Sequence, residues 1–284
     1  MLNAKLKFPA KRHKVLAFRL QPSAFAWSGF TLVELLVVIS ILGIIAYLTM
    51  PALKNFAKSD ATISASRQLL DGVARARQLA ISQRTTVYMV FVPTNFWADA
   101  TGNPSTWYSH LTPAAQTAAI NLCDKQLTGF TFMAKGAMGD QPGNHPWHYL
   151  APWQNLPDGA FIALQKFAYT NMIVDPITGA SYPIARFSYT NTIPFPTGMA
   201  TNGVWLPYIA FNYLGQLVSG RDEYIPLAHG SVLAAINPGT KALQFGSPDI
   251  LEMPPGNSTS ISYNIVHIDW LTGRAALEYH KMGP

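Results

Sequence analysis

The sequence predicts an α+β protein, in which a long N-terminal helix packs on a C-terminal domain built around an antiparallel β-sheet. From Leu35 to Met50 the chain has no charged residue, and apolar residues at helical spacing continue to about Arg84. After Arg84, short runs of β-branched and aromatic residues alternate with turns rich in Gly, Pro and Asn. The 284 residues suffice for one ordinary domain and such a helix.

Residues 1–29 form a basic leader without a single acidic residue. Removing its six basic residues from the 20 in the chain leaves 14 to balance 14 acidic residues. The formal charge of +6 therefore belongs to the leader, and nucleic-acid binding by the remainder is not expected. Positive charge ahead of an apolar helix keeps that end cytoplasmic, so the rest of the chain is exported. The six residues are Lys5, Lys7, Lys11, Arg12, Lys14 and Arg19.

Residues 30–53 are predicted to be the membrane-spanning half of the helix, about 36 Å long against a hydrocarbon core of about 30 Å. A secretory signal has a shorter apolar core that ends at an A-x-A-like site, unlike Met50-Pro51-Ala52-Leu53. We therefore expect cleavage ahead of the apolar run. One carboxylate, Glu34, lies near the start of the run, where an intramembrane charge usually signals a partner.

The stretch G-F-T-L-V-E at 29–34, with the apolar run behind it, resembles the prepilin leader and N-terminal helix of type IV pilins and type II secretion pseudopilins. The resemblance implies that a membrane peptidase cuts after Gly29 and that the new N-terminus, Phe30, is N-methylated. It implies that Glu34 neutralises the N-terminal ammonium of a neighbouring subunit during assembly. Pro51 stands where family helices carry a proline, which predicts a kink; alternatively it only ends the spanning segment.

Residues 54–84 are predicted to be the amphipathic half of the helix. An apolar stripe recurs there at spacings of three and four residues, widened by Leu70, Ala74 and Ile81. The basic residues of this half lie mostly off the stripe. They form either a solvated face of the helix or a face that contacts lipid headgroups or a neighbouring subunit. Gly72 is the weak point of the helix. The stripe comprises Ala61, Ala65, Leu69, Val73, Ala76 and Ala80.

Residues 85–284 are predicted to be a β-rich globular domain that begins with a strand at Thr85–Val92 and contains an irregular insertion at about 93–157. Within the insertion we expect a short helix at Pro113–Asn121 and a strand at Gly129–Ala134. The last third predicts a meander of hairpins. The later expected strands are Ala160–Gln165, Tyr182–Tyr189, Tyr208–Tyr213, Gln216–Ser219, Tyr224–Leu227, Ser231–Ile236, Ile261–Asp269 and Arg274–Tyr279.

Candidate metal sites are weak. His145 and His148 have the spacing of two metal ligands on one helix, but Pro146 and its neighbours predict a loop. Asp222-Glu223 could bind calcium, as a C-terminal loop does in some pseudopilins, although turn acids are the simpler interpretation. Cys123 is alone, so no intramolecular disulfide forms. We expect no metal, no cofactor and no catalytic residue.

The predicted function is that of a structural subunit, a minor pseudopilin of a type II secretion pseudopilus. The runs F-N-Y-L-G-Q near Phe211 and I-D-W-L-T-G-R near Asp269 resemble the minor pseudopilin H group. The implied partners are the prepilin peptidase, other pseudopilins or pilins, and the bacterial inner membrane, with one span and a periplasmic domain. The alternatives are a minor type IV pilus subunit or pilus-assembly protein that binds DNA or a surface, and a membrane-anchored enzyme with its site in Pro93–Pro157.

Overall fold

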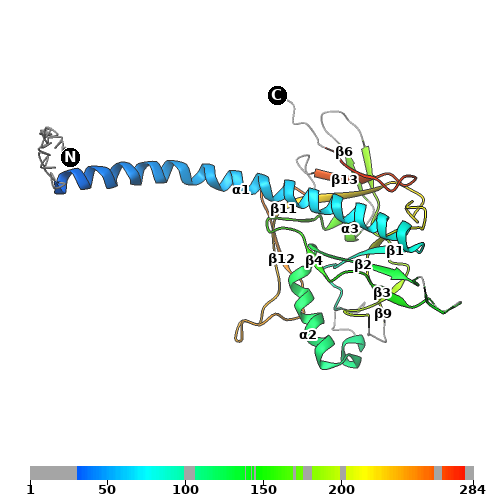
Figure 1. Ribbon diagram of the computed structural model, residues 1–284. Helices are drawn as coiled ribbons and strands as arrows, with labels where there is room; N and C mark the ends of the chain where they lie inside the picture. Colours follow the sequence, from blue (N-terminus) through cyan, green and yellow to red (C-terminus); the bar gives the residue numbers. More distant parts are fainter. Residues whose placement is uncertain are drawn as a thin grey trace, which may run out of the picture. The chain divides into compact units, whose positions relative to one another are not determined.

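The computed structural model describes residues 31–98, 106–137, 139–141, 143, 145–168, 171–174, 181–198, 203–258 and 264–278. It divides into two compact units, Met1–Pro51 and Ala52–Pro284, and helix α1 (Leu32–Gln83) belongs to both. Figure 1 shows the elements of the second unit. The remaining helices are η1 (Thr106–His110), α2 (Pro113–Asn121), η2 (Leu122–Lys125) and α3 (Gln165–Ala168).

The predicted α+β class, with an N-terminal helix and antiparallel sheets, is confirmed. The first sheet has the order β10-β1-β2-β3, with β4 also paired to β2, and the second has the order β12-β11-β13-β14, with β5 also paired to β11. Two further pairs are β6-β7 and β8-β9. The strands are β1 (Val87–Phe91), β2 (Gly129–Lys135), β3 (Trp147–Tyr149), β4 (Gln154–Asn155), β5 (Ala160–Ile162), β6 (Asn171–Val174), β7 (Ser181–Ile184), β8 (Thr192–Pro194), β9 (Gly203–Trp205), β10 (Tyr208–Phe211), β11 (Glu223–Leu233), β12 (Asp249–Glu252), β13 (Asn264–Ile268) and β14 (Ala275–Glu278).

The apolar stripe of α1 is buried as predicted, because residues at spacings of three and four share one face of a helix. The side chains of the stripe from Ala65 to Ala80 have no exposed surface, whereas Arg67, Arg75 and Arg84 are exposed. Of the three residues expected to widen the apolar face, Leu70 is half-buried, whereas Ala74 is exposed and Ile81 is 40% exposed. The stripe faces the main core, which includes residues of both large sheets.

Gly72 lies where α1 packs closely against the first sheet. A Cβ at Gly72 would lie 3.1 Å from Met89 Cε and 3.3 Å from Phe130 Cε2. The glycine that weakens the isolated helix therefore lets it lie close to β1 and β2.

Strand β1 is buried on both faces, which explains why it contains no polar alternation. Val87, Met89 and Phe91 belong to the core beneath α1, and Tyr88 and Val90 to a second core on the opposite face. That second core includes Ala119 of α2 and Leu122, and Figure 1 shows α1 and α2 on opposite sides of the first sheet.

Three expectations about the sheets differ from the structure. The segment 93–157, expected to be an insertion, supplies β2, the neighbour of β1 in the first sheet. The two strands expected on either side of His229-Gly230 form the single strand β11, in which Gly230 has φ +149° and continues the strand. The hairpin expected at Leu214-Gly215 is reduced to one bridge, Phe211 to Leu217, and the longer pairing of β10 is with β1.

Candidate functional site

The first turn of α1 is held by Thr31 and Glu34. The backbone N–H of Glu34 donates to Thr31 Oγ1 at 3.2 Å, and Thr31 N and Oγ1 both donate to Glu34 Oε2 at 3.4 Å. This reciprocal arrangement is a capping box, and its T-x-x-E pattern at 31–34 is a signal that the sequence carries in addition to the expected ones. The carboxylate contacts are long and exposed, so Glu34 retains capacity for a cationic partner.

The predicted cleavage and methylation positions, Gly29 and Phe30, lie outside the described residues. Both assignments stay predictions. Pro51 lies inside α1, which continues through it as one helix to Gln83. The predicted kink at Pro51 also stays a prediction.

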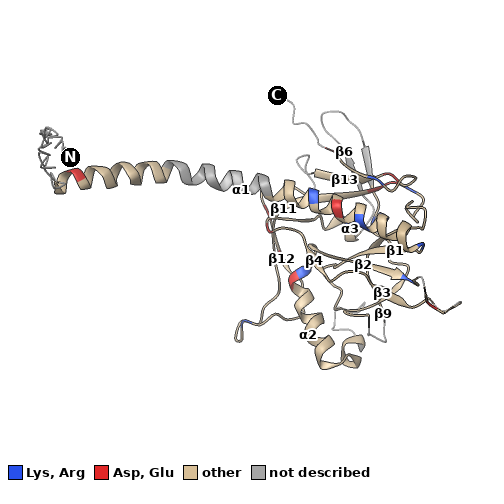
Figure 2. Cartoon of the chain, in the orientation of Figure 1, with Lys and Arg blue, Asp and Glu red and all other residues tan. Residues whose placement is uncertain are grey.

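The start of α1 exposes apolar side chains on every side. Between Leu32 and Tyr47 the large apolar residues are 43–80% exposed within the single chain. Figure 2 shows the corresponding ribbon as tan, with one acidic position at its beginning. Across the described residues, no helix combines the length and hydropathy required to cross a membrane. A helix that is apolar all round needs cover from other molecules.

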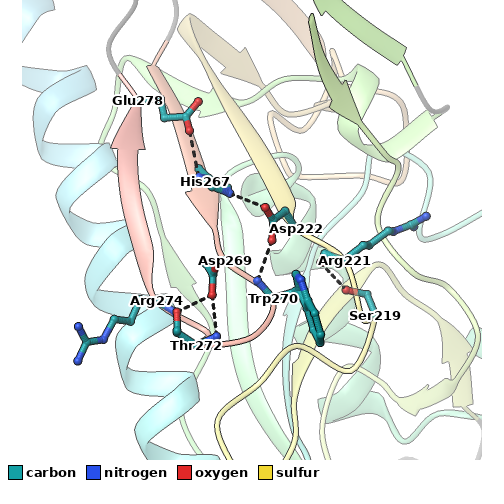
Figure 3. Close-up of polar contacts among 9 residues, drawn as sticks. All are labelled: Ser219, Arg221, Asp222, His267, Asp269, Trp270, Thr272, Arg274 and Glu278. Atoms are coloured by element: carbon teal, nitrogen blue, oxygen red, sulfur yellow. Dashed lines mark hydrogen bonds and ion pairs between the residues drawn. The ribbon is translucent and has the colours of Figure 1, made fainter.

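A polar cluster in the second sheet is centred on His267 of β13 (Figure 3). His267 Nε2 lies 3.1 Å from Asp222 Oδ2, and His267 Nδ1 lies 3.0 Å from Glu278 Oε1. The two contacts are both hydrogen bonds only when each ring nitrogen carries a proton. The ring also stacks on Tyr224, with centroids 4.6 Å apart. His267 thus connects the two strands that flank β13, through Glu278 of β14 and through Asp222, which immediately precedes β11.

The turn after β13 connects this cluster to α1. Asp269 Oδ1 accepts hydrogen bonds of 2.7 Å from both the hydroxyl and the backbone N–H of Thr272. Both hydrogen bonds lower the pKa of Asp269, and the bond from the Thr272 hydroxyl has the larger effect. Trp270 N donates to Asp222 Oδ1 at 2.9 Å, and Arg77 Nε of α1 donates to Thr272 O at 2.7 Å.

The two C-terminal runs on which the pseudopilin H resemblance rests lie side by side. Leu217 N donates to Trp270 O at 2.9 Å, and a Cβ at Gly273 would overlap the carbonyl oxygen of Gly215. Gly273 has φ +62°, and Gly215 has φ +80°, so both positions favour glycine. The sequence singled out both runs, but their contact is visible only in the structure.

The adjacent acids Asp222 and Glu223 do not form a shared calcium site. Asp222 contacts His267 and Trp270 N, whereas Glu223 Oε2 lies 2.6 Å from Lys166 Nζ in the core. Neighbouring residues of an extended chain point to opposite sides, so the two carboxylates diverge. Among the described residues, no three His, Cys, Asp or Glu side chains are arranged so that they could hold one metal ion.

The pair His145 and His148 is likewise divided. His148 Nε2 lies 2.9 Å from Asp140 Oδ2, and this hydrogen bond is the largest cause of a lowered pKa at Asp140. The ring of His145 lies instead beside Gly136. Strand β3 begins between the two histidines, so they do not lie on one helix. This agrees with the predicted loop and not with a pair of metal ligands on a helix.

The buried pair Lys166–Glu223 is the other concentrated charge. Lys166 Nζ also donates to Ala185 O at 2.7 Å and lies 4.8 Å from the centre of the Phe187 ring. Burial lowers the pKa of Lys166, while the Glu223 carboxylate opposes the change. A cavity of about 150 Å³ adjoins Glu223 and is lined by Ser188 and Tyr208 among others. Lys166 has no exposed surface and does not line the cavity, and its ammonium pairs with the Glu223 carboxylate inside the core.

Cys123 is buried, and burial raises its thiol pKa to about 12. A thiol with such a pKa is almost wholly protonated at neutral pH and is a poor nucleophile.

Comparison with known proteins gives one family match. Residues 28–46 match the model described as the prokaryotic N-terminal methylation motif. No curated protein matches the chain. Among solved structures, the type IV minor pilin FimU of Pseudomonas aeruginosa is 10% identical at a TM-score of 0.30, over 80% of this chain and 92% of that chain. The chain thus carries the prokaryotic N-terminal methylation motif, followed by an α+β domain with antiparallel sheets.

Proposed function

We propose that the chain is a structural subunit, a minor pseudopilin of a type II secretion pseudopilus. Its leader is removed by prepilin peptidase after Gly29, and Phe30 becomes the N-methylated end. The methylation motif at 28–46 supports this processing. In this proposal the protein is anchored in the bacterial inner membrane by residues 30–53 and exposes its domain to the periplasm.

One observation carries the proposal: the start of α1 presents apolar side chains all round and one carboxylate, Glu34. Neighbouring helices cover such a surface when they bundle in a filament. Glu34 then exchanges its long contacts with Thr31 for the ammonium of Phe30 in the next subunit. Pairing matters because an unpaired buried charge costs several kcal/mol.

The processing is tested by mass spectrometry of the full-length protein extracted from its native membrane. We expect an N-terminus of N-methyl-Phe30. A protein that still begins at Met1, or that has lost the helix to cleavage further downstream, contradicts the proposal.

Assembly is tested with Glu34→Leu. This variant should reach the membrane at the wild-type level but co-purify with other subunits about tenfold less, since the charge pair is lost. Ser40→Ala is the matched control, because the Ser40 hydroxyl donates only to Leu36 O in its own helix, at 2.8 Å. Co-purification of Glu34→Leu at the wild-type level would rule out the assigned role of Glu34.

Deletion of the gene separates the proposed machinery from a type IV pilus. Loss of protein secretion with intact surface pili is expected of a pseudopilin, and loss of pili with intact secretion indicates the pilus subunit instead.

A further inference from the structure

The ring of His267 contacts two carboxylates that differ in their other contacts (Figure 3). Glu278 Oε1 lies 3.0 Å from Nδ1 of the ring, and Glu278 Oε2 is buried without a hydrogen-bond partner in the described part of the chain. Asp222 Oδ2 lies 3.1 Å from Nε2, and Asp222 Oδ1 also accepts a hydrogen bond from Trp270 N at 2.9 Å. Glu278 therefore depends on the ring more than Asp222 does.

The charge of the ring decides how many of these contacts are hydrogen bonds. An imidazolium donates from both nitrogens, whereas a neutral imidazole has one N–H and one lone pair. The lone pair and a carboxylate oxygen are both acceptors, so one hydrogen bond is lost when the ring loses a proton. Losing the bond to Glu278 would leave a partly buried carboxylate without its donor, which is costly, whereas Asp222 keeps the N–H of Trp270. The neutral ring therefore keeps its proton on Nδ1, for Glu278.

The other charged groups around the ring either favour its charged form or point elsewhere. The carboxylate of Asp269 interacts electrostatically with His267. Tyr224 stacks on the ring with centroids 4.6 Å apart, which favours a cation. Figure 3 shows the side chains of Arg221 and Arg274 directed away from the ring. The strands β6 and β7, of which β7 packs beside Tyr224, contain no Asp, Glu, Lys, Arg or His.

We propose that His267 is a pH-controlled latch on the turn 219–222, which leads into β11. The doubly protonated ring fixes Asp222, and with it the turn, to β13. When the ring loses a proton, Asp222 is released from it and Glu278 stays. Histidine side chains change charge between about pH 5 and pH 8, which is the range in which the latch acts. The contact therefore stabilises the turn at the acidic end of this range and is lost as the pH rises.

The turn that the latch controls forms part of the wall of a cavity. Ser219 and Glu223, which lie on either side of Asp222 in the chain, line the cavity of about 150 Å³. The turn is also joined to the second C-terminal run, because Leu217 N donates to Trp270 O at 2.9 Å. Release of Asp222 thus loosens one wall of the cavity and the contact between the two runs.

The latch is tested by hydrogen–deuterium exchange of the full-length chain in detergent, at about pH 5 and about pH 8. Protection factors, which correct for the intrinsic effect of pH on exchange, are compared for residues 217–222 and 269–272. We expect the protection of both segments to fall about tenfold at the higher pH, because one hydrogen bond to a charged group is lost. The protection of β1 should stay the same, which shows that the chain remains folded.

Two substitutions of Asp222 separate the latch from ordinary packing. Asp222→Asn keeps an acceptor for Trp270 N, and its amide can donate to the lone pair of the neutral ring, so protection should no longer fall at the higher pH. Asp222→Ala removes both contacts, so protection should be low at both pH values. His148→Gln alters the contact between His148 and Asp140 in the first sheet. It is the matched control and should keep the wild-type pH dependence.

Nitrogen NMR of the chain with isotope-labelled histidine tests which contact the neutral ring keeps. The neutral His267 ring should carry its proton on Nδ1, and its signals are identified by their absence in His267→Gln. Three outcomes would overturn the inference: a neutral ring protonated on Nε2, equal protection of the two segments at both pH values in the wild type, or an unchanged pH dependence in Asp222→Asn.

Discussion

Lys166 Nζ lies 2.6 Å from Glu223 Oε2, and their side chains are 0% and 3% exposed, so the ion pair is enclosed in the core. Glu223 opens β11 and Lys166 belongs to α3, which places the pair between elements remote in sequence. Removing Lys166 takes away the closest partner of the buried Glu223 carboxylate and leaves only the exposed Arg221, whose Nε lies 3.9 Å from Glu223 Oε1.

We therefore predict that Lys166→Met lowers the free energy of unfolding by about 3–5 kcal/mol. The double variant Lys166→Met with Glu223→Leu should lose clearly less, because no charge stays unpaired. Chemical denaturation of the full-length chain in detergent measures both. Equal losses in the single and double variants would show that packing, and not charge, dominates at this position.

His267 offers a second test, in the polar cluster. His267→Phe keeps a ring that can stack on Tyr224 but removes both contacts to the carboxylates of Asp222 and Glu278. We expect a loss of about 1–3 kcal/mol in unfolding free energy, since the two acids lose their shared donor. Tyr224→Leu is the comparison variant, which removes the stacking and leaves both contacts of His267 to the carboxylates. If His267→Phe unfolds like the wild type, the cluster does not stabilise the sheet.

Asp269 should make the stability dependent on acid pH. Its pKa is lowered in the folded chain, so its contribution is present above the unfolded pKa of about 3.9 and is lost as pH falls through the folded pKa. Asp269→Asn keeps an acceptor oxygen but cannot titrate, so its unfolding midpoint should fall less steeply below about pH 4. An identical pH profile for Asp269→Asn and the wild type would contradict the assignment.

Gly72 tests the close packing of α1. Gly72→Leu should cost about 1–3 kcal/mol, because the side chain meets Met89 and Phe130. Ala74→Leu places the same side chain at an exposed position of the same helix, and its effect should stay within about 0.5 kcal/mol. Similar thermal unfolding midpoints for the two variants would mean that the interface has room to adapt.

The local elements were the most predictable. The helix Pro113–Asn121 was predicted with its observed bounds, and its Thr112 cap accepts a hydrogen bond from Ala115 N at 3.4 Å. The N-terminal motif was also recognised from consecutive residues. The Asp222-Glu223 pair was considered as a calcium site, but the two side chains turn to different partners. The His267 cluster left no short-range signal, since its members come from three separate stretches of chain.

The sequence by itself determined the helix α1 and the face that it buries, because the spacing of Ala65, Leu69, Val73, Ala76 and Ala80 is a property of neighbouring residues. Only the tertiary structure decided which strands pair. Val87 of β1 lies opposite Phe211 of β10 on one side and Ala134 of β2 on the other. The local sequence pattern does not tell which apolar strands of similar length will pair with each other. Their choice depends on how the two cores fill on either side of β1, which involves residues more than a hundred positions apart.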